Sequence, residues 1–347
     1  MRRKVATLVL GALVIACASG TGEAEVVSSI TNASLLPALE VSSRGAADLK
    51  AAAGEYCANP STANRDALAE AWEVSKAAWG HAWLTTWFGP ADMLRTVSRV
   101  DYQPIDEEAI EDLLASTEPL DADYMMNQAA STQRGLGAIE YLVYGESDPG
   151  EERRCELLSA TVEVVASEVE ALEKAWSESH QGGAPFAESF AGESMPSNDA
   201  LGELVSAAVE TLKQQSLYQV GKAIGISASE ADPAAIPEGE AGLASDFYRA
   251  QLESIQSMLD AGAPDSLGDL VEARSPEVKA RIDEHVEGAF AELDGIKGPM
   301  REIAADAPDD LAPLYEHLSD LLSAFESDVV SLLDITLGFS DTDGDTG

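Results

Sequence analysis

The spacing of apolar residues is helical along almost the whole chain, and this restricts the fold more than any other feature of the sequence. No segment shows the apolar and polar alternation that is typical of a half-buried strand. Prolines are scarce within the long periodic segments and lie mostly between them. The chain is therefore predicted to be all-α, and at 45% hydrophobic residues it can bury a substantial core.

The predicted helices form two sets. In the first set, helices are expected over about residues 38–57, 61–87, 105–116 and 123–144, and from the turn at 145–150 to about residue 179. In the second set, they are expected over about residues 198–223, 242–262, 276–305 and 309–337. Ser275-Pro276 is a typical helix start, with serine at the N-cap and proline at the first helical position. Four long helices with short connections favour an up-down bundle.

A segment rich in glycine and proline separates the two sets and marks the predicted domain boundary. It runs from Gly182-Gly183-Ala184-Pro185 to Pro196-Ser197-Asn198. The predicted division assigns residues 1–16 to a signal peptide, 17–27 to a lipidated tether, 28–180 to a first helical bundle, 181–197 to the linker and 198–347 to a second bundle.

The N-terminus predicts where the protein works. Three basic residues, Arg2 to Lys4, precede the apolar run Val5–Ala16, which is too short to span a bilayer comfortably as a helix. The run ends Val14-Ile15-Ala16-Cys17, which resembles a bacterial lipoprotein cleavage site; a plain secretory signal is the alternative. Lipid on Cys17 would anchor the protein in the bacterial cell envelope facing the periplasm. Ala18 after the cysteine favours outer-membrane sorting in a cell with two membranes.

The cysteines of the mature chain predict a disulfide. Removing Cys17 leaves Cys57 and Cys155, an even pair in an oxidising compartment. Cys57 ends one predicted helix and Cys155 begins another, so a disulfide between the two helices is predicted, with two buried free thiols as the alternative. Neither cysteine has a second cysteine or a histidine nearby in sequence, which argues against a metal site built on them.

The charge of the chain excludes some partners. With 62 acidic and 21 basic residues, the formal net charge is −41. Nothing resembles a basic patch, so nucleic acid and direct binding to anionic lipid are both disfavoured, and the lipid on Cys17 must provide the membrane attachment. The acidic residues are spread over many predicted helices, which indicates a solvated surface suited to saline surroundings rather than a metal site.

The stretch from Gly135 to Gly145 carries the candidate site residues. At 100° per residue, its aliphatic side chains fall on one side of a helix, and the other side carries Gly137, Glu140, Tyr141 and Tyr144. Glycine costs about 1 kcal/mol relative to alanine inside a helix, so its presence here indicates a packing or functional reason. The plainer interpretation is a core helix with a hydrogen-bonded glutamate.

The same stretch resembles the signature of the imelysin family, in which Gly-x-His-x-x-Glu precedes an apolar and aromatic run. Gly135 and Glu140 match this signature, while Gly137 stands at the position of the histidine. Two other segments are similar to imelysin-like proteins: the run that ends Phe88-Gly89-Pro90-Ala91-Asp92, and the C-terminal run from Leu337 to Asp345. The resemblance implies a fold of two helical bundles. It also implies a link to iron or haem acquisition, and the family is classed among the metallopeptidases as well.

Four tryptophans occur at helical spacing. Trp72, Trp79, Trp83 and Trp87 line one predicted helical stripe, and such a stripe usually packs in a core. The functional alternative is an apolar wall beside Glu140. Both interpretations hold if Trp72 and Trp79 are in the core and Trp87 lies nearer a cleft.

Known metal-site motifs are missing. The sequence contains neither the Glu-x-x-His pairs of a di-iron bundle nor a His-Glu-x-x-His zinc motif, and its four histidines, at positions 81, 180, 285 and 317, are isolated in sequence. The run Asp341-Thr342-Asp343-Gly344-Asp345 resembles the first half of a calcium loop but lacks the closing glutamate, so a solvated tail is predicted.

These observations lead to one principal hypothesis: a lipid-anchored envelope protein that binds a small ligand or metal complex at an interdomain cleft without catalysing a reaction. Glu140 is the central predicted contact, and the other predicted ligand-binding residues are Gly135, Gly137, Tyr141, Tyr144, Trp87 and Asp92. No catalytic set is predicted, the metal is unknown, iron or haem is the cofactor that the resemblance implies, and envelope transport proteins are the expected partners. The alternatives are a metallopeptidase of the imelysin type and a structural or partner-binding envelope protein.

Overall fold

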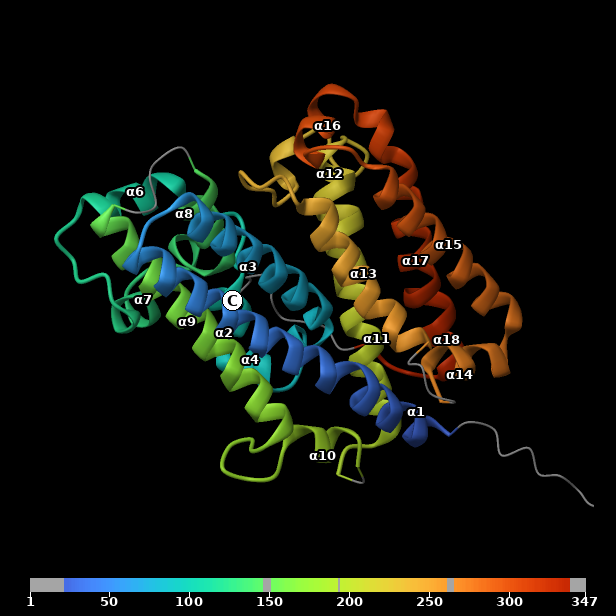
Figure 1. Ribbon diagram of the computed structural model, residues 1–347. Helices are drawn as coiled ribbons and strands as arrows, with labels where there is room; N and C mark the ends of the chain where they lie inside the picture. The colour runs from blue at the N-terminus through green and yellow to red at the C-terminus, as the bar shows by residue number, and fades with distance from the viewer. Residues whose placement is uncertain (1–21, 146–150, 193, 261–264, 338–347) are drawn as a thin grey trace, which may run out of the picture.

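The computed structural model describes residues 22–145, 151–192, 194–260 and 265–337, and this part of the chain is helical with no strand (Figure 1). The all-α prediction is confirmed. The predicted signal peptide, Cys17 and the run Asp341–Asp345 lie outside the described residues. No described helix is both long enough and apolar enough to cross a membrane.

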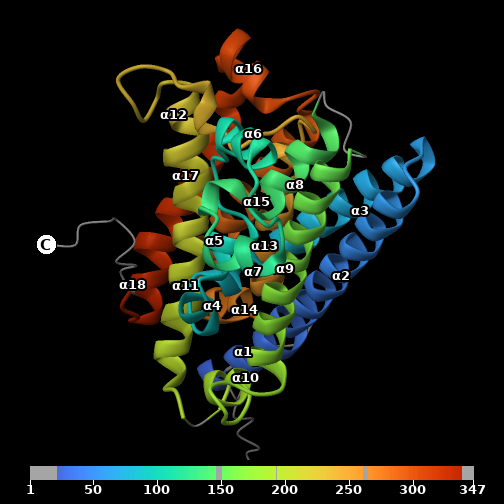
Figure 2. The same cartoon turned by 90° about the vertical axis from the view of Figure 1, so that its left-hand side faces the viewer.

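The first group of helices is built around three long, closely packed elements. These are α2 (Leu36–Ala58), α3 (Thr62–His81) and α9 (Glu152–Ser177). A helix α1 (Glu23–Ile30) continues into α2 through a π-helical segment, Thr31–Leu35. Figure 2 looks onto the side where the short helices gather: α4 (Pro90–Leu94), α5 (Thr96–Val100), α6 (Glu107–Ala115), α7 (Ala122–Asn127) and α8 (Gly135–Tyr144).

The second group of helices follows the short α10 (Phe186–Phe190). Its longer elements are α11 (Ser197–Lys213), α13 (Ala244–Asp260), α15 (Pro276–Gly295) and α17 (Ala312–Ser323). Its shorter elements are α12 (Gly221–Ala223), α14 (Leu267–Arg274), α16 (Met300–Asp306) and α18 (Val330–Leu333). Two π-helical segments, Gln214–Val220 and Ala324–Val329, continue α11 and α17. The Ser275 hydroxyl accepts from the Val278 N–H, which caps α15 as the sequence predicts.

The two groups meet mainly where α3 packs against α13 (Figure 1). Gly80 makes this contact close, because a Cβ atom at that position would lie 2.7 Å from the Cβ of Ala250. The N-terminal helix α1 also packs against α11 and α14 of the second group. Helix α1 therefore lies against the second group before α2 enters the first.

The predicted linker contains α10, and this helix is packed against the first group. Phe190 is fully buried, stacks on Phe88 with ring centroids 5.2 Å apart, and meets Trp176 edge to face at 5.5 Å. Phe186 contacts Trp176 in the same way at 4.9 Å. The segment rich in glycine and proline is therefore not an extended connection, because two of its aromatic side chains pack in a small cluster on the first group.

Several predicted helices are shorter than expected. The helix predicted over 61–87 ends at His81 and is followed by a 3-10 turn, Trp83–Thr86. The helix predicted over 123–144 is interrupted, since α8 starts afresh at Gly135, where φ is +86° and a Cβ atom would lie 2.7 Å from the Val100 carbonyl oxygen. Both the positive φ and the close contact require glycine at position 135, and helical periodicity reveals neither of them.

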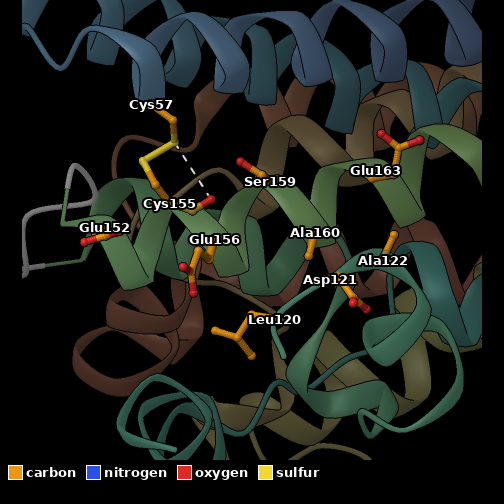
Figure 3. A pocket seen from close by; sticks show the side chains of 10 residues that line it. All are labelled: Cys57, Leu120, Asp121, Ala122, Glu152, Cys155, Glu156, Ser159, Ala160 and Glu163. Carbon is orange, nitrogen blue, oxygen red and sulfur yellow. Dashed lines mark hydrogen bonds between the residues drawn. A yellow bond between two sulfur atoms is a disulfide. The ribbon is translucent and has the colours of Figure 1, made fainter. Parts of the chain in front are cut away.

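Cys57 and Cys155 form a disulfide between α2 and α9, with Cα atoms 5.6 Å apart. Figure 3 shows it beside a groove of about 650 Å³ that is also lined by Leu120 and by the acidic residues Glu152 and Glu156 of α9. The bond joins residues 98 positions apart. Closing a loop of that size stabilises the folded chain by about 4 to 5 kcal/mol in the chain-entropy model.

Candidate functional site

Glu140 extends from α8 of the first group to a loop of the second. Its carboxylate accepts a hydrogen bond of 3.0 Å from the Ala241 N–H, and its side chain is buried, with 6% of the residue exposed. Gly239 leaves room for it, because a Cβ atom there would lie 2.5 Å from the carboxyl group. The residue predicted to be central is thus bonded across the junction of the two groups.

Burial raises the pKa of Glu140 above its usual value. The Ala241 N–H and the Lys76 ammonium act in the opposite direction, while the charges of Asp101 and Glu238 raise the pKa further. The carboxylate therefore carries its charge at a cost that its single hydrogen bond does not fully offset.

A buried ion pair lies near Glu140. The Lys76 ammonium donates to both carboxylate oxygens of Asp101, at 2.7 and 2.6 Å, and the Asp101 side chain is almost fully buried. The same ammonium lies 4.0 Å from the ring centroid of Phe247 on α13, a cation–π contact across the junction. Lys76 thus links both groups and neutralises the carboxylate beside it.

Glu238 holds the loop that Glu140 contacts. Its carboxylate accepts hydrogen bonds from the N–H groups of Ala244, Met300 and Arg301, at 3.3, 3.1 and 2.7 Å. It therefore satisfies free donors at the start of both α13 and α16. The Arg301 side chain also donates to the Ile236 carbonyl oxygen at 3.0 Å. The loop that presents the Ala241 N–H is fixed at both ends.

Gly137 creates the space that Gln103 occupies. A Cβ atom at Gly137 would lie 2.5 Å from Gln103 Nε2 and 2.7 Å from Ile105 Cγ2. The segment from residue 103 to residue 105 therefore covers the position where the family signature has histidine. A carboxamide from another part of the chain lies against the helix at this point.

The two tyrosines of α8 bond away from Glu140. The Tyr141 hydroxyl donates to Glu111 at 2.8 Å, and the Tyr144 hydroxyl donates to Glu73 at 2.7 Å. Burial raises the pKa of Tyr144, and Glu73 and Glu140 add to that shift. The sequence places Glu140, Tyr141 and Tyr144 on one face of a helix. In the fold these side chains bond to different parts of the chain, because a different segment covers each turn of α8. Asp92 lies in α4, and only its backbone is described.

A cavity of about 620 Å³ opens beside this network, between the two groups. The first group lines it mainly with residues from the tryptophan-rich turn and from α5, and the second with residues from the π-helical continuation of α11, from the loop at Pro237 and from α13. Its lining includes Trp83, Thr86, Trp87, Ala91, Arg95, Thr96, Val97, Ser98, Asp101, Tyr102, Gln103, Ser131, Gln214, Gln219, Pro237, Phe247 and Gln251. A volume of this size is typical of a site for a small organic molecule.

The four tryptophans divide between the core and the cavity. Trp72 and Trp79 are in the core, and the Trp72 indole N–H donates to the Leu136 carbonyl oxygen at 2.8 Å, which ties α3 to α8. Trp87 lines the cavity, and its N–H donates to Thr211 at 3.0 Å. Trp83 lines it as well and meets Phe247 edge to face at 5.6 Å. Glu140 is not a lining residue, so the aromatic wall faces the cavity and not this carboxylate.

Polar atoms without a protein partner gather around the cavity. Trp83 Nε1, Thr96 Oγ1 and Gln219 Oε1 belong to lining residues, and Gln215 Oε1 belongs to the adjoining π-helical segment. Buried polar groups are normally paired, and π-helical segments are frequent at functional sites. Both features make the cavity a candidate ligand site.

Sequence reasoning missed several residues of this junction, namely Lys76, Arg95, Asp101, Gln103, Glu238 and Phe247. Lys76 had a recognisable signal, because it is four residues after Trp72 and three before Trp79 and so is a charged residue on the aromatic stripe. The others have no such signal, since each is brought to the site by a separate segment.

Two of the histidines that are isolated in sequence meet in the fold. His285 of α15 and His317 of α17 have their Nδ1 atoms 3.4 Å apart, and Gly288 provides the space for the His317 ring. Among the described residues, no group of three or more histidine, cysteine, aspartate or glutamate side chains is placed to hold a metal ion.

Comparison with known proteins places this geometry in context. The family model described as imelysin (peptidase M75) matches residues 35–324. An iron-regulated protein A precursor from Parabacteroides distasonis has a similar solved structure, with 17% identity, a TM-score of 0.77, and coverage of 90% of this chain and 95% of that one. An imelysin-like protein from Psychrobacter arcticum is 20% identical, with a TM-score of 0.76 and coverage of 91% and 97%. No curated protein matches.

The raised pKa of Glu140 predicts a stability difference that depends on pH. A carboxyl group whose pKa is higher in the folded state destabilises the fold when ionised, and this cost disappears as the pH falls through the folded-state pKa. We expect Glu140→Gln, which keeps an acceptor for the Ala241 N–H, to be more stable than wild type at pH 7, by about 1.4 kcal/mol per unit of pKa shift. The difference should shrink on acidification, as measured by urea unfolding between pH 4 and pH 8.

The matched control for this measurement is Glu287→Gln, since Glu287 is an exposed carboxylate in the middle of α15. This variant should show no comparable change with pH. A constant difference between Glu140→Gln and wild type across the range would contradict the prediction.

The contact between Gly137 and Gln103 predicts that Gly137→Ala destabilises the protein. The added methyl group would displace Gln103 and Ile105, and overpacking of this kind costs about 1 to 3 kcal/mol. Gly54→Ala is the control, because no atom lies within 4 Å of a Cβ atom there, and it should stabilise α2 by about 1 kcal/mol. Thermal unfolding distinguishes the two; equal stabilisation by both substitutions would show that Gly137 is not constrained.

Proposed function

The chain belongs to the imelysin family, and from this premise we propose that it is a cell-envelope protein that binds a small ligand or metal complex and serves iron or haem acquisition. The proposed binding site is the cavity between the two groups of helices. The observation that carries this proposal is the cavity itself, with an aromatic wall on one side and polar atoms without protein partners around it. Ligand sites are usually concave and mostly apolar, with a few convergent polar groups.

The link to iron comes from the relatives. The similar structure from Parabacteroides distasonis is named as an iron-regulated protein A precursor, and we extend that association to this chain as part of the proposal. Glu140 and the Lys76–Asp101 pair serve to fix the loop and the helices that frame the cavity. In this role Glu140 acts by joining the two groups, at a distance from the ligand.

Peptide hydrolysis is the alternative activity that the family name raises. The described site does not favour it, since the Glu140 carboxylate is bonded to a backbone N–H and does not line the cavity. A structural or partner-binding role without a small ligand is the other alternative, and the binding experiment below distinguishes it.

Binding of haemin and ferric citrate to the purified protein tests the proposal. We expect wild type to bind at least one of these probes with one-to-one stoichiometry by calorimetry and native mass spectrometry with elemental analysis. Val97→Trp, which fills part of the cavity wall, should weaken binding by a factor of ten or more. Val74→Trp, on an exposed part of α3 where 55% of Val74 is accessible, should bind like wild type. Failure of wild type to bind either probe would favour a structural or partner-binding role.

We also propose that lipid on Cys17 anchors the protein on the periplasmic side of the envelope, in the outer membrane where the cell has one, with envelope transport proteins as partners. The basic and apolar N-terminus and the small or branched residues before Cys17 support this. Cys17→Ser should move the protein from the membrane fraction to the soluble fraction. Retention of the variant in the membrane fraction would contradict lipid anchoring.

A further inference from the structure

Arg95 is the unpaired cation of the described chain. Every other described lysine and arginine forms an ion pair or a hydrogen bond through its side chain, and Arg95 forms neither. Acidic residues outnumber basic ones by 62 to 21, so partners are plentiful over most of the surface. Arg95 differs from the other described basic residues in this respect, and its exposed side chain lines the cavity.

The backbone at Arg95 is also unusual. Its φ of 52° and ψ of 39° place it in the left-handed region, which side chains other than glycine, asparagine and aspartate rarely adopt. The Ser98 hydroxyl donates to the Arg95 carbonyl oxygen at 2.8 Å and holds this conformation. Strained residues cluster at ligand sites, so the observed backbone is consistent with a functional position.

The charge balance of the cavity lining favours an anion. Among the described lining residues, the other charged one is Asp101, and its carboxylate is neutralised by two hydrogen bonds from Lys76. This leaves the Arg95 guanidinium as the uncompensated charge of the lining. Guanidinium groups bind carboxylates and similar oxyanions through paired hydrogen bonds.

The rest of the wall favours a flat apolar body. Trp83, Trp87 and Phe247 line the cavity, and Trp83 lies edge to face with both of the other rings, at 6.2 and 5.6 Å. Phe247 is buried and the Lys76 ammonium lies over its ring, whereas Trp83 and Trp87 are partly exposed, so the two tryptophans are the rings available to a conjugated ligand. A volume of about 620 Å³ accommodates a molecule of several fused rings.

We propose that the cavity binds a flat, conjugated organic anion, with its anionic oxygens on Arg95 and its ring system against Trp83 and Trp87. This inference rests on the proposed function, in which the cavity is the ligand site, and adds the chemical class of the ligand. Arg95 is then the residue that selects charged over neutral ligands of the same shape.

Two probes of nearly equal shape test this selection. We expect 2-naphthoate to bind wild type at least ten times more tightly than the neutral 2-naphthamide in calorimetry at low ionic strength, and to bind more weakly as salt is added. Arg95→Gln should lose at least tenfold in affinity for 2-naphthoate and little for 2-naphthamide. Arg95→Gly, which suits the left-handed backbone, should show the same loss, so a folding defect cannot account for it. Arg44→Gln, at an exposed ion pair on α2, is the control and should leave both affinities unchanged.

Three outcomes would overturn the inference: equal affinity of wild type for the two probes, naphthoate binding that survives both Arg95 substitutions, or no binding of either probe. Equal affinities that Val97→Trp abolishes would overturn the choice of an anion and still support the cavity as a ligand site. If neither probe binds, the anion inference fails, and the proposed function is judged separately by haemin and ferric citrate.

Discussion

The close packing of α3 against α13 is the contact on which the rest of the arrangement depends. Gly80 permits it, because any larger residue would press on Ala250 and on the Phe247 ring. This contact brings Lys76 over Phe247 and places Trp83 beside the same ring. The cation, the aromatic wall and the cavity they border therefore all follow from one close approach of two helices.

The buried charged groups at this junction differ in the partners that stabilise them. Lys76 and Asp101 neutralise each other at hydrogen-bonding distance, whereas Glu140 accepts its hydrogen bond from a backbone N–H and has a raised pKa. Glu238 uses its charge to satisfy donors at two helix starts. Burial of a charge is costly unless the charge is paired, so among these groups the energetic cost of burial falls mainly on Glu140. Glu140 depends for its hydrogen bond on the Ala241 N–H of the second group, so a change in how the two groups meet would affect it directly.

The glycine at the histidine position of the family signature leaves space for residues from another segment. Gln103 and Ile105 come close to the space above Gly137, and Gln103 also lines the cavity. A side chain at position 137 would therefore push a cavity-lining amide out of place. In this chain the signature helix contributes to the cavity indirectly, through the residue that its glycine admits.

The sequence by itself determined the all-helical fold and the burial of Trp72 and Trp79, because helical periodicity records which residues share a face, and its motifs indicated the family. It also singled out Glu140 as an unusual carboxylate in an apolar helix. The tertiary structure alone decided that α8 starts at Gly135, that Tyr141 and Tyr144 bond to Glu111 and Glu73, and that Arg95 and Gln103 line the cavity. Periodicity describes one segment at a time, whereas the partners of a side chain are set by which other segments pack against it.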